Sequence, residues 1–106
     1  MSDDIVARLF DRARTLVTDA TEGRSYGMRA LRYRGRPLVA IAATASGYSV
    51  YPFSPAVIDA VASRNVGMAH SKGAVTATDA RPLAPEAFDA LVLARRAEID
   101  AALGDR

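Results

Sequence analysis

The chain has 106 residues, 14 Lys and Arg against 12 Asp and Glu, a formal net charge of +2 and no cysteine. Half of the residues are hydrophobic and a quarter are charged, which excludes intrinsic disorder as the main state and indicates one soluble domain over residues 1–106. The lack of cysteine excludes disulfides, thiolate metal sites and a cysteine nucleophile.

The first third of the chain predicts a helix and a strand. Apolar residues recur at helical spacing after an acidic start, so we expect a helix over residues 3–20, ended by Gly23. From Met28 the apolar period changes to two, which is typical of a strand. Glycine and proline in segment 34–37 then indicate a turn.

Two further strands are expected in the middle of the chain. Residues 38–45 are almost continuously apolar, which favours a central strand that is covered on both sides. Residues 48–53 alternate after the turn signal Ser46-Gly47, and they predict a third strand that closes a meander.

The second half of the chain predicts two helices around a short strand. Ser54-Pro55 is a helix-start pair, because serine accepts from a free backbone N–H and proline has none to lose; this helix should run to about Ser63. Segment 74–78 indicates a fourth strand, and a helix is expected over residues 85–103, ended by Gly104. The order αβββαβα predicts an α+β fold, an antiparallel sheet with helices packed on it.

The first residues give an expectation about location. The chain begins Met1-Ser2-Asp3-Asp4, which is acidic where a targeting segment would be basic. The longest wholly apolar run, Leu38 to Ala43, is far shorter than the roughly 18 residues that suggest a membrane-spanning helix. We therefore expect a cytoplasmic protein.

Positive charge is concentrated in residues 23–58, which carry five arginines and no acid. The five are Arg24, Arg29, Arg32, Arg34 and Arg36. An anion would be expected to bind here, and nearby tyrosines could stack on nucleotide bases. A net charge of only +2 does not favour nucleic acid, and the alternative is that these arginines solubilise strand edges.

The only histidine and the only lysine lie together in His70-Ser71-Lys72-Gly73. A lysine, a hydroxyl and free backbone N–H groups in a loop could hold a phosphate or a carboxylate. The alternative is a turn shaped by Ser71 and Gly73 with a solvated lysine. His70 and Ser71 do not form a catalytic dyad, because adjacent residues on extended backbone point to opposite sides.

A single histidine allows no histidine cluster, so a metal ion would need carboxylates. The acids of the expected first helix alternate with Arg8, Arg12 and Arg14 at spacings of three and four. Such a pattern is typical of a solvated, ion-paired face.

Four segments carry a resemblance to a known family: Tyr26-Gly27-Met28, Gly35-Arg36-Pro37-Leu38-Val39, Val50-Tyr51-Pro52 and Ser71-Lys72-Gly73. Taken in order, they resemble the YdhG-like family of small bacterial domains, over nearly the entire chain. The resemblance implies a single α+β domain similar to frataxin. Part of that family is described as iron chaperones that serve iron–sulfur or haem assembly.

The first functional hypothesis is a non-enzymatic, cofactor-free binding module of the YdhG-like type, for an anionic metabolite or an acidic protein surface. Its candidate ligand-binding residues are Arg29, Arg32, Arg34, Tyr51, His70, Ser71 and Lys72. An enzyme is the least favoured class, because the sequence offers no nucleophile with a base and no cofactor motif.

The alternative hypothesis is a frataxin-like iron chaperone. It would hold iron(II) weakly through oxygen ligands on Asp4, Asp11 and Glu22 and would dock to an assembly partner. Under either hypothesis a homodimer could bury a second apolar face of the strand expected at residues 38–45.

Overall fold

The chain folds into three helices and five strands over the part that the structure describes. The computed structural model describes residues 2–104, with side chains from Asp4 onward. The elements are α1 (Ser2–Leu16), β1 (Thr21–Ser25), β2 (Met28–Tyr33), β3 (Arg36–Ala43), β4 (Gly47–Tyr51), α2 (Pro55–Ala62), β5 (Val75–Thr78) and α3 (Pro85–Leu103).

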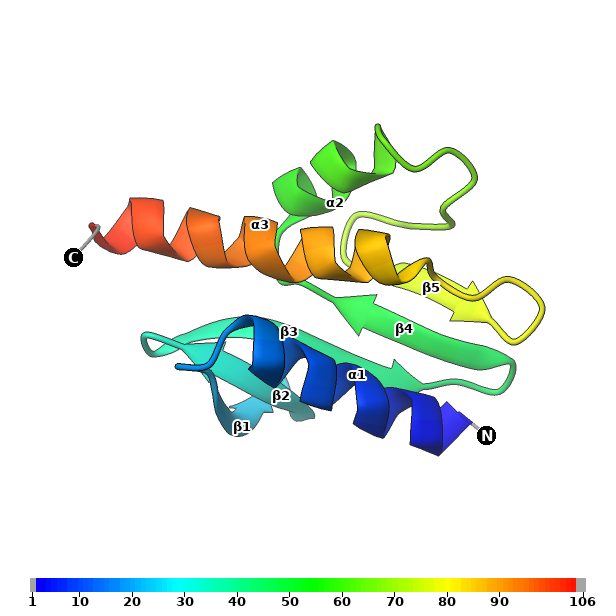
Figure 1. Ribbon diagram of the computed structural model, residues 1–106, viewed down its shortest axis with the longest axis horizontal. Helices are drawn as coiled ribbons and strands as arrows, with labels where there is room; N and C mark the ends of the chain where they lie inside the picture. The colour runs from blue at the N-terminus through cyan, green and yellow to red at the C-terminus, as the bar shows by residue number, and fades with distance from the viewer. Residues whose placement is uncertain (1, 105–106) are drawn as a thin grey trace.

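The five strands form one antiparallel sheet in the order β1-β2-β3-β4-β5. The helices α1 and α3 lie side by side against one face of this sheet, and α2 packs beside α3 (Figure 1). The Cα radius of gyration is 12.8 Å, close to the roughly 13 Å expected for a single domain of this length. The expected α+β class, with helices packed on an antiparallel sheet, is confirmed. In residues 2–104 no helix is both long and apolar enough to cross a membrane.

The expected element order was wrong in one place, because β1 lies between the first helix and β2 and the order is αββββαβα. The sequence of β1, Thr-Glu-Gly-Arg-Ser, contains no apolar residue, so a hydrophobic pattern gives no sign of it. The two-residue turn Tyr26-Gly27 returns the chain antiparallel to β1, with φ values of 52° and 77° as a tight hairpin turn requires. Gly23, which was expected to end the helix, pairs instead with Ala30 inside this hairpin.

The first helix ends at Leu16 and not at the expected Ala20. Thr18 and Asp19 form a turn in which the Ala20 N–H donates to the Val17 carbonyl at 3.0 Å. Both turn residues are poor helix formers. Val17 still packs in the core, so the apolar pattern continues past the end of the helix and misplaced the boundary.

The helices of the second half agree with the sequence. The Ser54 hydroxyl accepts from the Val57 N–H at 3.2 Å, and Pro55 is the first residue of α2, so the helix-start pair is confirmed. The last helix, α3, has the expected bounds and Gly104 as its C-cap.

The core lies between the sheet and the two helices α1 and α3. Its largest fully buried side chains include Phe10 of α1, Leu31 of β2, and Phe88 and Leu91 of α3. Burial of large apolar side chains is the main favourable term in the folding of such a domain. No buried side-chain nitrogen or oxygen of the described residues lacks a hydrogen-bond partner, so the core carries no unpaired polar group there.

A β-bulge in β3 sends two adjacent side chains into this core. Leu31 pairs with Val39 but Arg32 pairs with Pro37, so Leu38 has no partner in β2. Leu38 and Val39 both belong to the core cluster, whereas a regular strand would point them to opposite faces. The bulge thus accounts for the burial of Leu38 beside Val39 in the core.

The face of the sheet away from α1 and α3 carries a row of small residues. Gly23, Ala30 and Ala40 are register partners across β1, β2 and β3. Ala30 and Ala40 are fully buried although neither belongs to the core cluster. Side chains this small leave room for the β1–β2 hairpin to bend over this face. As a result the ring of Tyr26 stacks on Phe53, with ring centroids 6.0 Å apart, although β3 separates β2 from β4.

The bulge generates a stability prediction. Leu38→Ala should lower the free energy of unfolding by about 2–5 kcal/mol, because the side chain is fully buried and leaves a cavity. Leu93→Ala, at a 36% exposed position of α3, is the control and should cost less than about 1 kcal/mol. Urea denaturation of both variants measures the difference. A Leu38→Ala loss no larger than that of the control would contradict the packing assigned to the bulge.

Candidate functional site

A cavity of about 400 Å³ lies beside the turn of the β1–β2 hairpin. Its volume is within the range of roughly 300–1,000 Å³ that is usual for small-molecule sites. The hairpin, the start of β3, the β4–α2 junction, the α2–β5 loop and α3 all contribute to its walls. We call it the aromatic cavity. Its lining residues are Tyr26, Met28, Pro37, Tyr51, Phe53, Ser54, Pro55, Gly73 and Arg95.

Two of the aromatic residues in this cavity have strained backbones. Tyr26 has a φ of 52° and Phe53 a φ of 60°, in the left-handed region that bulky residues rarely adopt. Such a conformation costs on the order of 1–3 kcal/mol and persists only where the surroundings hold it. Tyr26 is 87% exposed, so burial of its own ring offsets little of that cost. The φ of Tyr26 is the one that its two-residue hairpin turn requires, and Arg34 before Gly35 has a similar φ of 53°. Phe53 lies between β4 and α2, so its positive φ has no hairpin turn to account for it.

A polar network fixes the wall that α3 contributes. The Arg95 Nε donates to the Pro37 carbonyl at 3.0 Å, and Nη1 donates to Glu98 Oε1 at 2.7 Å. The other Glu98 oxygen accepts from the Ser54 hydroxyl at 2.7 Å, while that hydroxyl accepts from the Val57 N–H. The network joins α3 to the starts of β3 and α2. It also leaves the Arg95 charge with a carboxylate beside it.

The segment that was expected to hold an anion borders the aromatic cavity through Gly73. The Ser71 N–H donates to the Ala74 carbonyl at 2.8 Å, so Lys72 and Gly73 form the tip of a tight turn. The His70 Nδ1 lies 3.0 Å from the Met68 carbonyl and is engaged with the backbone of its own loop. Lys72 is exposed, and it makes no ion pair with a carboxylate of the described side chains.

Residues 23–58 contain no acidic residue, but two of their arginines form ion pairs with acidic residues outside this segment. Arg29 pairs with Glu22 at 3.0 Å, and its guanidinium lies over the Phe10 ring, 4.3 Å from the centroid. Arg34 pairs with Asp100 of α3 at 2.9 Å. These two arginines therefore tie the sheet to α1 and α3, and their charges are compensated.

Of the expected ligand-binding residues, Tyr51 alone is among those that line the aromatic cavity. His70, Ser71 and Lys72 precede the lining residue Gly73 but are not lining residues themselves. Arg29 and Arg34 are held by the ion pairs just described. Arg32 donates to the backbone carbonyls of Arg24 and Gly35 and is likewise not a lining residue.

Among the lining residues that were not in the expected ligand-binding set, Tyr26, Phe53 and Arg95 carry most of the site's chemistry, and of these only Tyr26 was among the tyrosines expected to stack on a base. The Tyr-Gly pair marks a turn, and this was the available sign for Tyr26. Nothing local marks the other two, because the stacking of Phe53 and the bond from Arg95 to the Pro37 carbonyl join segments far apart in the chain.

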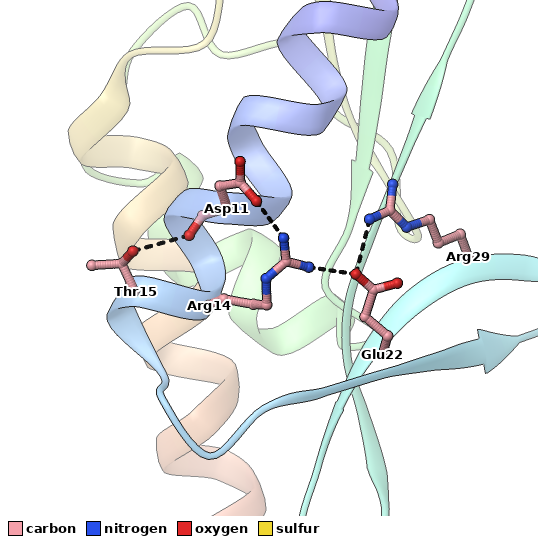
Figure 2. Close-up of polar contacts among 5 residues, drawn as sticks. All are labelled: Asp11, Arg14, Thr15, Glu22 and Arg29. Atoms are coloured by element: carbon pink, nitrogen blue, oxygen red, sulfur yellow. Dashed lines mark hydrogen bonds and ion pairs between the residues drawn. The ribbon is translucent and has the colours of Figure 1, made fainter.

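Two of the three carboxylates expected under the iron alternative, Asp11 and Glu22, are engaged by arginine. Arg14 bonds both Asp11 and Glu22, the latter at 2.6 Å, and Glu22 also pairs with Arg29 (Figure 2). Asp4 lies about two turns before Asp11 on α1. Across the described side chains, no group of three or more His, Cys, Asp or Glu residues is placed to hold a metal ion. A guanidinium between two carboxylates opposes the binding of a cation there.

Hydrogen bonds and ion pairs shift the pKa of several groups outside the cavity. The Arg29 guanidinium, which bonds Glu22, lowers the pKa of that carboxyl. The Tyr33 hydroxyl donates to Asp100 at 2.8 Å and, together with Arg34, lowers the pKa of Asp100. The same hydrogen bond raises the pKa of the Tyr33 phenol. The Glu22–Arg29 contact joins β1 to β2, whereas the Asp100 contacts join α3 to the end of β2 and the turn after it.

The chain matches no family model, no curated protein and no solved structure. The functional argument therefore rests on the geometry of the described residues.

The Asp100 contacts predict a change of stability with pH. Because the folded pKa is lowered, the stabilisation is complete above the unfolded value of about 4 and is lost as the pH falls through the folded value. Asp100→Asn should therefore lower the free energy of unfolding near pH 7 and reduce its decrease toward about pH 3. Denaturant unfolding at both pH values measures this. Asp59→Asn, at an exposed position of α2, is the control, and an equal pH dependence in the two variants would refute the prediction.

Proposed function

We propose that the protein is a non-enzymatic binding module whose aromatic cavity takes a small anionic ligand with a flat apolar body. The observation that carries the proposal is the pair Tyr26 and Phe53, two aromatic residues held at positive φ in a cavity that Tyr51 also lines. Aromatic walls favour a flat ligand, because ring stacking and apolar burial both stabilise it.

The charges around the aromatic cavity favour an anion. Arg95 is the one charged residue among those that line the cavity, and Lys72 lies next to the lining residue Gly73. Glu98 offsets the charge of Arg95, whereas no described carboxylate pairs with Lys72. An anionic group on the ligand would therefore pair best with the Lys72 ammonium, in a charge-assisted hydrogen bond.

The lining residues do not support a covalent reaction. They include no Asp, Glu, His or Cys that would act as a base or as a nucleophile. The Ser54 hydroxyl is buried. It accepts a hydrogen bond as the cap of α2 and donates one to Glu98, so it is engaged both as acceptor and as donor. We therefore propose binding without chemistry.

The resemblance to the YdhG-like family supports the same cavity. Each of the four segments that carry it supplies lining residues: Tyr26 and Met28, then Pro37, Tyr51 and Gly73. Segments that are far apart in the chain thus meet at one place. We include in the proposal that the chain shares the frataxin-like scaffold of that family. The iron-chaperone alternative gains no comparable support, since two of the three carboxylates that it needs, Asp11 and Glu22, are held by arginines.

A ligand titration followed by NMR tests the proposal. The ¹⁵N-labelled protein is titrated with three flat anions, benzoate, indole-3-acetate and adenosine monophosphate. Acetate, citrate and phosphate serve as anions without a flat apolar body. We expect saturable shifts from at least one flat anion at residues 26–28, 51–54 and 71–74, and none from the other three up to about 10 mM, a concentration that detects even weak binding.

Two variants and a control sharpen this test. Tyr26→Asn should keep the fold, because asparagine tolerates positive φ, and should weaken the flat anion about tenfold by removing the ring. Lys72→Gln should weaken it about five- to tenfold, whereas Arg8→Gln, at an exposed position of α1, should leave it unchanged. Undiminished binding by Tyr26→Asn, or the absence of saturable shifts at the cavity with all three flat anions, would refute the proposal.

A further inference from the structure

A second cavity of about 440 Å³ shares no lining residue with the aromatic cavity. Residues 65–69 of the α2–β5 loop form one wall, and β5 with the turn that follows it forms another. The first turn of α3 completes the cavity with Ala87. We call it the Arg81 cavity, after the one ionisable residue among those that line it.

The lining of the Arg81 cavity is mostly apolar. Met68 and Leu83 are half-buried, and Ala87 is buried at its inner end. Val66 is fully exposed and is also among the lining residues. An apolar ligand part would remove surface of both the ligand and these side chains from water.

Backbone hydrogen bonds hold the walls of this cavity in place. The Thr78 N–H donates to the Arg81 carbonyl at 3.2 Å, and the Arg81 N–H donates to the Thr78 carbonyl at 3.1 Å, so the turn that presents Arg81 is closed on both sides. The Leu83 N–H donates to the hydroxyl of the buried Tyr48 at 3.0 Å. The Thr76 N–H donates to the Ala69 carbonyl at 3.0 Å, which ties the loop to β5.

The Arg81 charge has no partner within the described part of the chain. No carboxylate of the described side chains forms an ion pair with it. Its nearest acids in sequence, Asp79 and Glu86, are not among the residues that line the cavity. An uncompensated guanidinium beside apolar walls matches a ligand that is negative at one end and apolar along the rest, since guanidinium pairs with carboxylate through two parallel hydrogen bonds.

We propose that the Arg81 cavity binds a small amphipathic monocarboxylate. The carboxylate pairs with the Arg81 guanidinium, and an apolar tail of about six to eight carbons lies along Met68, Leu83 and Ala87, in a cavity of a size usual for small ligands. This site is independent of the aromatic cavity, because the ligand needs no flat ring and touches no residue of the other lining.

The test uses octanoate as the probe and octanol as its uncharged counterpart. Titration of the ¹⁵N-labelled protein with octanoate should give saturable shifts at residues 65–69 and 76–87. Affinity should rise by about fourfold for each CH₂ added between butanoate and octanoate, because each buried CH₂ contributes a constant increment. Octanol should bind at least about tenfold more weakly than octanoate, since it lacks the charge.

Variants of Arg81 separate a specific site from a non-specific apolar surface. Arg81→Gln should weaken octanoate about tenfold and leave octanol unchanged, and Arg81→Lys should restore part of the loss. Arg64→Gln, the adjacent exposed arginine outside the lining, is the control and should change neither. Equal binding of octanoate by Arg81→Gln and the natural chain would overturn the proposal. Shifts confined to the aromatic cavity, or no saturable shift up to about 10 mM octanoate, would overturn it as well.

Discussion

One face of the sheet is covered by α1 and α3 (Figure 1), and Ala30 and Ala40 are buried on the other face, where no helix of the described residues covers them. The row of Gly23, Ala30 and Ala40 lies on this face, and side chains of this size allow the β1–β2 hairpin to bend over β3. Both alanines are buried, and Tyr26 at the hairpin turn stacks on Phe53. The aromatic cavity lies where the bent hairpin meets the end of β4. Its position therefore follows from the bend of the hairpin over this face.

The same bend gives the arginine stretch a structural role. A Cβ atom on Gly23 would lie 2.8 Å from the Arg32 Cδ, so glycine at this position leaves the space that the Arg32 side chain occupies. From there the Arg32 guanidinium reaches two backbone carbonyls, those of Arg24 and Gly35, which belong to opposite ends of the bent strands. Arg29 pairs with Glu22 of β1 and lies over the Phe10 ring of α1, and Arg34 pairs with Asp100 of α3. The sequence presents these arginines as a free cationic patch, but Arg29, Arg32 and Arg34 are held in contacts within the fold.

The sequence was sufficient where local chemistry decides the structure and insufficient where distant contacts do. Ser54-Pro55 predicts the start of α2 because capping needs only neighbouring residues, and α3 follows from an amphipathic pattern between proline and glycine. The polar strand β1 has no pattern of its own and exists through its pairing with β2. Whether an arginine is free to bind a ligand likewise depends on acidic residues of other elements. Neither composition nor spacing reveals which acidic residue lies next to which arginine.

The candidate site also combines residues that the sequence could identify with residues that only contacts between distant segments reveal. Tyr51 could be selected from residue type, and it lines the aromatic cavity, whereas His70, Ser71 and Lys72 precede the lining residue Gly73 without lining the cavity themselves. Phe53, by contrast, alternates like a residue of the third expected strand, and only its positive φ and its stacking on Tyr26 distinguish it. Such strain depends on the fold that enforces it, so a sequence pattern carries no sign of it.

The α2–β5 loop takes part in both cavities without joining them. Its first part, residues 65–69, lines the Arg81 cavity, and Gly73 near its end lines the aromatic cavity. Between these parts the loop is fastened to its own end and to β5, because the Thr76 N–H bonds the Ala69 carbonyl, His70 bridges to Val75 and the Ser71 N–H bonds the Ala74 carbonyl. These hydrogen bonds oppose the spread of a displacement from residues 65–69 to Gly73, or in the reverse direction. A loop of this kind can hold two chemically different surfaces, one aromatic and one aliphatic, on a domain of 106 residues.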